Sequence, residues 1–182
     1  MRVEGSRCAV RPWRLTDTDA IVKHANNPNI ARQLRDRFPH PYTRRHAVEF
    51  LEHATSTEPT AHFAIEVGGE AVGGVGFVRG TDVERYSAEI GYWLGEALWG
   101  RGITTESVAL VTDYVFTQLD ILRLFALPFA DNAASRRVLE KAGYSCEGIL
   151  RASAVKFGEP RDQALYSRIS SGWKRRSEEV LI

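Results

Sequence analysis

The chain has 182 residues, of which 43% are hydrophobic and 26% charged, and this suits a single folded domain with a substantial core. A formal net charge of +1 gives no general electrostatic case for binding nucleic acid. No apolar run approaches the roughly 20 residues that span a bilayer, and residues 1–13 lack the apolar core of a signal peptide, so we expect a cytoplasmic protein without a membrane segment. The two cysteines, Cys8 and Cys146, are too few for a disulfide scaffold and stand beside no metal-ligating set, so we expect reduced thiols and no metal site.

The first half of the chain alternates helical and extended patterns. Thr16 and Thr43 are expected to cap helices, and Pro28 follows the end of the first of them. Gly68 and Gly69 lie between two apolar runs, which is typical of a hairpin turn. In chain order we predict a strand within residues 7–14, helices over 16–25, 28–34 and 44–54, and strands over 62–67 and 71–78.

The central stretch, residues 88–119, reads as strand, glycine loop and helix. The apolar run that ends at Leu94 predicts a buried strand, and residues from Thr104 onward recur at helical spacing. Gly100 and Gly102 lie just before that helix, where unpaired backbone amides and the helix dipole favour a phosphate group. The loop is not a Walker loop, because Ile103 stands where that motif needs Lys. It is not a Rossmann loop either, because no third glycine follows at the spacing which that motif requires.

Downstream, a second apolar strand over residues 122–127 precedes a short helix. Asp131 or Asn132 is placed to cap that helix, and Gly143 is placed to end it. Two further strands are expected over residues 145–154 and 162–169, followed by a polar tail over 171–182.

Five segments together resemble the GNAT superfamily of acyl-CoA-dependent N-acyltransferases, and most closely its RimJ/RimL-type branch. These segments read EIGYWL, WGRGITTES, DNAASRRVLEKAGY, EGILR and RDQALYSRI, and the resemblance covers residues 6–170. It implies one α+β domain over residues 1–182, with a mixed, mostly antiparallel sheet of about seven strands, splayed at its centre and flanked by helices. The splay is expected between residues 89–94 and 122–127, where the arm of acetyl-CoA would pair with free backbone groups.

The resemblance also implies which residues hold acetyl-CoA. Main-chain contacts to the pantetheine arm are expected from the strand, the pyrophosphate is expected on the glycine loop, and two polar residues of the next helix complete the site. The residues concerned are Tyr92, Trp93, Leu94, Trp99, Gly100, Arg101, Gly102, Ile103, Thr104, Thr105, Asn132 and Ser135. Asn132 has a second interpretation as a plain helix cap.

The catalytic groups are less well specified by the sequence. Glu89 stands where related enzymes often place a carboxylate near the acceptor amine, and it is the candidate base; the alternative is a structural ion pair with Arg79 or Arg85. Many members of the resembled family carry a Tyr as general acid where this chain has Leu139. Ser135 is the remaining candidate acid, and its alternative is a polar residue of the first helical turn.

The sequence therefore predicts an acetyl-CoA-dependent N-acetyltransferase that acts by direct transfer in a ternary complex. The amine acceptor stays open among a protein N-terminus, a polyamine and a small molecule such as an amino acid or an antibiotic. The alternative is an acyl-CoA-binding regulatory module without transferase activity, and a further possibility is a longer acyl donor. Because relatives are often dimers, the resemblance also implies a homodimer.

Overall fold

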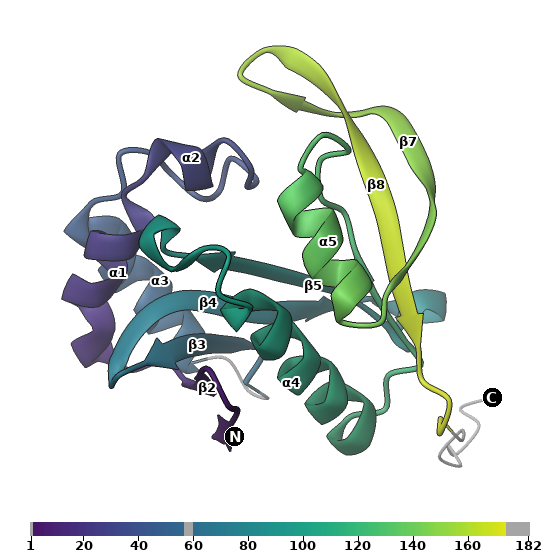
Figure 1. Cartoon of the computed structure of the whole chain (residues 1–182), viewed down its shortest axis with the longest axis horizontal. Coiled ribbons are helices and arrows are strands. Elements are labelled where there is room, and N and C mark those ends of the chain that lie inside the picture. The colour runs from purple at the N-terminus through teal and green to yellow at the C-terminus, as the bar shows by residue number, and fades with distance from the viewer. Residues whose placement is uncertain (1, 57–59, 174–182) are drawn as a thin grey trace.

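An open sheet of eight strands runs through the protein, with helices packed on both of its faces (Figure 1). The computed structural model describes residues 2–56 and 60–173. The strands are β1 (Val3–Glu4), β2 (Ala9–Pro12), β3 (His62–Val67), β4 (Glu70–Arg79), β5 (Ser87–Leu94), β6 (Arg123–Ala126), β7 (Ser145–Lys156) and β8 (Glu159–Ile169). The helices are α1 (Thr18–Ala25), α2 (Pro28–Ala31), α3 (Arg44–Ser56), α4 (Ile103–Gln118) and α5 (Ala133–Lys141). The predicted fold class is confirmed, and the two-residue β1 is the strand beyond the expected seven.

The sheet opens at its centre, as the sequence predicts. Its strand order is β1-β2-β3-β4-β5-β6-β8-β7, and among the described strands β5 with β6 is the one parallel pair. This pair shares a ladder only from Ser87 to Glu89 of β5, whereas the ladder of β5 with β4 continues to Leu94. Beyond Glu89, one edge of the β5 backbone therefore has no strand partner in the described part of the chain, and its N–H and C=O groups can pair with a bound amide chain.

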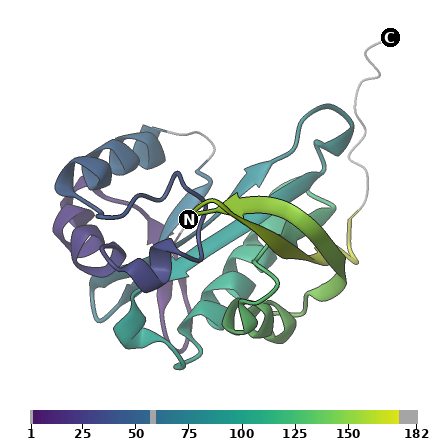
Figure 2. The ribbon, with the colours of Figure 1, turned by 90° about the horizontal axis from the view of Figure 1, so that it is seen from above.

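Alternating side chains of the central strands supply two separate cores. Ile90 and Leu94 of β5 pack with Val111 of α4 in the larger core, between the sheet and helices α4 and α5. Trp93 of β5 packs against a second core that includes Leu51 of α3, between the sheet and helices α1 and α3. Figure 2 shows these two groups of helices on opposite sides of the molecule. Successive residues of β5 thus face two different compartments.

Two helix starts differ from the predictions. Thr16 does not cap α1, because it lies in a single 3₁₀ turn, Leu15–Asp17, and α1 begins only at Thr18. The Asp17 carboxylate, which would otherwise cap the helix, accepts hydrogen bonds from the buried Arg11 guanidinium instead. Helix α4 begins at Ile103, one residue earlier than expected, because Gly102 adopts a left-handed φ of 77° and turns the chain directly into the helix.

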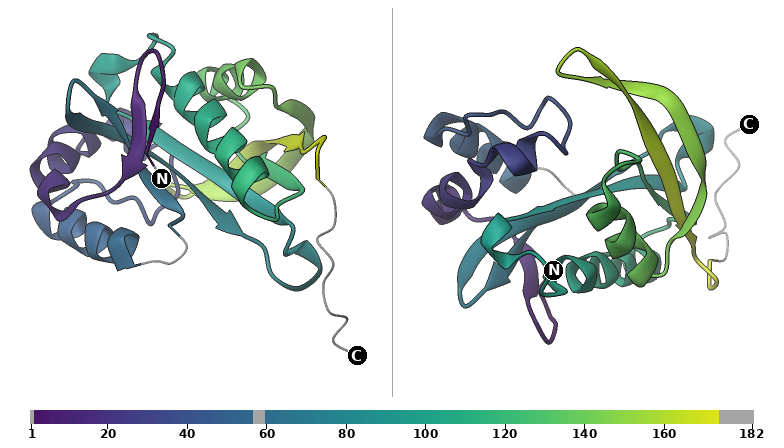
Figure 3. Two further views of the ribbon diagram at one scale, coloured as in Figure 1. Left: turned by 90° about the horizontal axis from the view of Figure 1, so that it is seen from below. Right: turned by 45° about the horizontal axis from the view of Figure 1, so that its top comes forward.

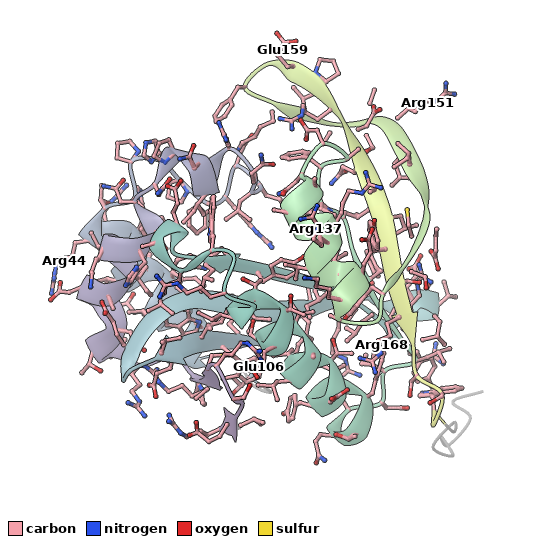
Figure 4. The ribbon with its side chains drawn as sticks, in the orientation of Figure 1. Arg44, Glu106, Arg137, Arg151, Glu159 and Arg168 are labelled. Carbon is pink, nitrogen blue, oxygen red and sulfur yellow. The ribbon has the colours of Figure 1, made fainter. Side chains whose placement is uncertain are left out.

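Glu106 in the first turn of α4 anchors the segment that leads into β2 (Figure 4). Its carboxylate accepts hydrogen bonds from the amides of Ser6, Arg7 and Cys8 at 2.9, 2.7 and 3.0 Å, and from the Ser6 hydroxyl at 2.6 Å. Burial opposes ionisation, but these donors outweigh it and lower the pKa of Glu106 to about 2. An ionised carboxylate therefore fixes the N-terminal segment beside the glycine loop.

The β7–β8 hairpin arches over the open side of the sheet towards the segment that follows α2 (Figures 2 and 3). At its tip the Lys156 ammonium donates to Asp36 at 2.7 Å, although 120 residues separate the two in sequence. Lys156 is buried in spite of its charge. At the opposite end of the hairpin, Trp173 donates to Asp120 at 2.8 Å, so the predicted polar tail begins with an anchored residue. Residues 174–182 of that tail lie outside the described residues.

Candidate active site

A cleft of about 660 Å³ lies at the splay of β5 and β6, between the glycine loop and the start of α5. Thirteen positions were predicted from the sequence, and all but Arg101 line this cleft. They are Glu89, Tyr92, Trp93, Leu94, Trp99, Gly100, Gly102, Ile103, Thr104, Thr105, Asn132 and Ser135. Arg101 is exposed and does not line the cleft, although Gly100 and Gly102 on either side of it do.

The N-terminus of α4 opens into this cleft. Gly102 has no side chain to cap the helix, so the first-turn amides of Ile103, Thr104 and Thr105 have no partner within the helix. The peptide dipoles of the 16 residues of α4 are aligned along the helix, and their positive end lies at this N-terminus. The Trp99 indole donates to the carbonyl of Leu94 at 2.8 Å and thereby fixes the glycine loop against the end of β5. This arrangement is suited to an anion such as pyrophosphate.

Helix α5 adds two cations to the cleft, and neither is among the thirteen predicted positions. Arg137 and Lys141 both line the cleft, whereas Arg136 donates to the Tyr166 hydroxyl at 3.1 Å on the other side of the helix (Figure 4 labels Arg137). Residues four apart share one face of a helix, so the position of Lys141 was the available signal for Arg137.

Asn132 does cap α5, as its plainer interpretation predicts. Its side-chain oxygen accepts from the Ser135 amide at 3.0 Å. The cap uses only that oxygen, so the amide nitrogen of Asn132 is left to face the cleft without a hydrogen-bond acceptor among the described residues. The two interpretations of Asn132 are therefore compatible.

Two hydroxyl groups meet on the floor of the cleft. Tyr92 of β5 places its hydroxyl 2.9 Å from the Ser135 hydroxyl and 3.2 Å from the Ser135 carbonyl. Burial, partly opposed by the hydrogen bond to Ser135, raises the pKa of Tyr92 above its ordinary value, so the phenol keeps its proton at neutral pH. The sequence predicted only main-chain contacts for Tyr92, and no local signal indicated that its side chain would reach α5.

Leu139, at the position where many relatives carry the acid Tyr, lies fully buried in the larger core. Tyr144 is also structural: its hydroxyl is buried 2.8 Å from that of Thr112, and burial raises its pKa to about 12. Neither residue reaches the cleft, so any proton donor on the protein has to come from another position.

Glu89 lies where β5 and β6 part, and its side chain is 30% exposed. It forms an ion pair with Arg35, from the segment after α2. The ion-pair alternative from the sequence named Arg79 or Arg85 as the partner instead. The carboxylate is therefore ion-paired and at the same time accessible from the cleft.

A second cavity, of about 890 Å³, lies on the side of the sheet that faces α1 and α3. Aromatic side chains from three separate segments contribute to it, and His46 lines it whereas His40 does not. The two cavities share part of their walls, namely Leu34, Arg35, Glu89, Gly91, Tyr92 and Trp93. Glu89 and its ion-pair partner therefore stand at the junction of the two spaces.

Comparison with known proteins agrees with this geometry. Residues 7–145 match the family model described as an acetyltransferase (GNAT) domain. The chain is 32% identical over 157 residues to the probable N-acetyltransferase YjcK of Bacillus subtilis, covering 82% of this chain and 86% of that one. It is 29% identical over 164 residues to the uncharacterized N-acetyltransferase p20 of Bacillus licheniformis, covering 88% and 92%. The solved structure of RimL, a ribosomal L7/L12 alpha-N-protein acetyltransferase in complex with coenzyme A, superposes with a TM-score of 0.82 at 20% identity, over 93% of this chain and 98% of that one.

The chain therefore belongs to the GNAT acetyltransferase family and is an N-acetyltransferase, as the sequence predicts. Enzymes of this family use acetyl-CoA as the acetyl donor. In the part of the chain that the structure describes, no helix is long and apolar enough to cross a membrane.

Proposed function

We propose that this enzyme transfers the acetyl group of acetyl-CoA directly to a primary amine, with both substrates bound at once. The observation that carries the proposal is the shared wall of the two cavities at Glu89 and Gly91. A donor in the cleft and an acceptor in the second cavity would meet across the same strand, so transfer needs no covalent intermediate on the protein.

The donor is held by three features of the cleft. The open edge of β5 offers backbone groups to the pantetheine amides, and the first turn of α4 offers free amides to the pyrophosphate. Arg137 and Lys141 supply positive charge along the same path. Together they orient the thioester towards the junction of the cavities.

Glu89 is the proposed base. It accepts a proton from the acceptor ammonium, directly or through water, and the neutral amine attacks the thioester carbonyl; the new C–N bond forms and the C–S bond breaks. Arg35 is the ion-pair partner of this carboxylate before the acceptor binds, and the acceptor ammonium takes its place.

The proposed acid is the pair of hydroxyl groups at Ser135 and Tyr92. The Ser135 hydroxyl gives its proton to the departing thiolate and is reprotonated by Tyr92, 2.9 Å away. Tyr92 recovers its proton, through water, from the attacking nitrogen, which loses its second proton as the amide forms. The sequence analysis named Ser135 alone as the candidate acid. Tyr92 supplies a phenol hydroxyl, which the buried Leu139, at the position where many relatives carry the acid Tyr, does not have.

Two measurements on one sample test the proposal: calorimetric titration with acetyl-CoA, then thiol release in the presence of a panel of amines. We expect binding followed by release. Binding without release by any amine would favour the regulatory-module alternative, and a preference for propionyl- or succinyl-CoA would favour the longer donor. Absence of acetyl-CoA binding would refute the assignment of the cleft.

The cytoplasmic location and the homodimer expected from the sequence stay predictions. Sedimentation of the purified protein at several concentrations would measure the latter, and a single monomeric species throughout would exclude the dimer.

A further inference from the structure

Gly91 is exposed to solvent, although it lies in the middle of β5, an interior strand of the sheet. Its neighbour Ile90 is buried in the larger core, on the opposite face of the strand. A Cβ atom at Gly91 would meet nothing within 4 Å, and Gly91 belongs to the wall that the two cavities share. Glycine therefore keeps an open space above this position, beside the splay, and we call it the Gly91 space.

The register of the strands shows which side chains face this space. Glu89, Gly91 and Trp93 alternate along β5, so they share one face of the sheet. On that face Gly91 pairs with Gly76 of β4, and Gly76 pairs with His62 of β3, the three strands lying side by side (Figure 1). Because neither glycine has a side chain, His62 is the first side chain on this row beyond the Gly91 space.

The His62 imidazole leans across β4 towards the Gly91 space. A Cβ atom at Gly76 would lie 3.0 Å from His62 Nδ1, so the ring covers Gly76. Neighbouring strands are about 4.8 Å apart, and a ligand above Gly91 would therefore lie beside this ring. His53 of α3 packs near the ring, with the two ring centroids 5.6 Å apart. The imidazole and the Glu89 carboxylate thus lie on one face of the sheet, around one open space.

The imidazole of His62 is available to a ligand. The side chain is half-buried and lines the second cavity, and neither ring nitrogen has a hydrogen-bond partner within residues 2–56 and 60–173. Burial, assisted by His53 and by the positive charge of Arg37, lowers the pKa of His62, so the ring is neutral at pH 7. A neutral imidazole offers one N–H donor and one acceptor nitrogen, and it does not repel an ammonium group.

We propose that the reacting amine of the acceptor occupies the Gly91 space, and that His62 is a specificity-determining residue that hydrogen-bonds to a polar group of the acceptor close to that amine. Glu89 accepts the proton from two residues away on β5, whereas His62 contacts the acceptor from the side of β4. The other edge of β5 opens just beyond Glu89, so a thioester bound there reaches the same space. This inference rests on the proposed function, because it gives the acceptor amine a position at the junction of the two cavities.

Filling the Gly91 space tests the position of the amine. Gly91→Ala places a methyl group where no atom lies within 4 Å, so the melting temperature and the affinity for coenzyme A should stay unchanged. In the thiol-release assay, kcat/KM for the most rapidly acetylated amine of the panel should fall at least tenfold, because the methyl group displaces the reacting nitrogen. Gly148→Ala is the matched control: its Cβ atom also meets open space, Gly148 lines neither cavity, and kcat/KM should not change.

Two substitutions of His62 test its hydrogen bond. His62→Phe keeps a planar ring but removes both nitrogens, and it should raise the KM for the same amine about tenfold with kcat within twofold. His62→Gln restores a donor and an acceptor, and its KM should lie within about threefold of wild type. His40→Phe is the matched control, because His40 is exposed and lines neither cavity, and it should leave the KM unchanged.

An unchanged kcat/KM in Gly91→Ala would overturn the position of the amine. An unchanged KM in His62→Phe, or a KM in His62→Gln as high as that in His62→Phe, would overturn the hydrogen bond. A parallel loss of coenzyme A affinity in the His62 variants would show a structural role and overturn the assignment of His62. Failure of the proposed function is distinguishable, because wild type itself would then bind no acetyl-CoA or release no thiol with any amine.

Discussion

Replacing Glu106 by Gln removes a negative charge that accepts hydrogen bonds from three backbone amides, the Ser6 hydroxyl and the Cys8 thiol. The difference between the ordinary carboxyl pKa of 4.5 and the value of about 2 in the folded protein corresponds to about 3 kcal/mol of folding free energy. The amide of the Gln side chain would also direct an N–H group at backbone amides that are themselves donors. We therefore expect Glu106→Gln to lower the free energy of unfolding at pH 7 by about 3 kcal/mol, and the melting temperature by about 6–12 °C.

The loss of stability caused by Glu106→Gln should depend on pH. Because folding depresses the pKa of Glu106, its contribution is complete above the ordinary pKa of 4.5 and is lost as the pH falls towards about 2. The difference in stability between wild type and variant should therefore be full at pH 7, about half as large at pH 3, and close to zero by pH 2.

Urea unfolding of both proteins at pH 7 and pH 3 measures this difference. Glu159→Gln is the matched control, since Glu159 is exposed in the turn of the β7–β8 hairpin, and its change should stay within about 0.5 kcal/mol (Figure 4). A loss below about 1 kcal/mol at pH 7, or the same loss at both pH values, would refute the reasoning.

Four further predictions concern the site. Glu89→Gln should lower kcat about 100-fold or more in the thiol-release assay with unchanged acetyl-CoA affinity, and full turnover would remove Glu89 from the mechanism. Tyr92→Phe should lower kcat at least tenfold with acetyl-CoA but not with an acetyl thioester of an acidic thiophenol, whose thiolate leaves without a proton; equal losses with both donors would indicate a purely structural role. Gly102→Ala, at a φ of 77°, should destabilise the fold by about 1 kcal/mol and weaken calorimetric binding of acetyl-CoA, whereas Gly148→Ala, with open space at Cβ, should do neither. Lys156→Met should raise the KM for the acceptor several-fold at constant acetyl-CoA affinity, because it releases Asp36 from the hairpin tip beside Arg35; an unchanged KM would show that this contact does not shape the acceptor cavity.

The resemblance of five segments to the GNAT superfamily implied the family and the splay between β5 and β6, and these implications are confirmed. Twelve of the thirteen predicted site residues line the cleft. The elements that form the cleft had local signals. The apolar run of β5, the glycines of the loop and the Asn132 cap depend on backbone angles and on neighbours a few residues apart. The same locality explains the errors. Thr16 has the side chain of a helix cap, but α1 begins at Thr18, and the contact of Asp17 with the buried Arg11 has no local signal in the sequence.

Only the tertiary structure decided which groups meet. Tyr92 and Ser135 are 43 residues apart in sequence and Arg35 and Glu89 are 54 apart, and each pair is brought together by the order of strands and by the path of the segment after α2. The second cavity depends on the same arrangement, because the residues that line it come from separate elements. Contacts of this kind leave no periodic trace in the chain, since their energy depends on side chains that become neighbours only after folding.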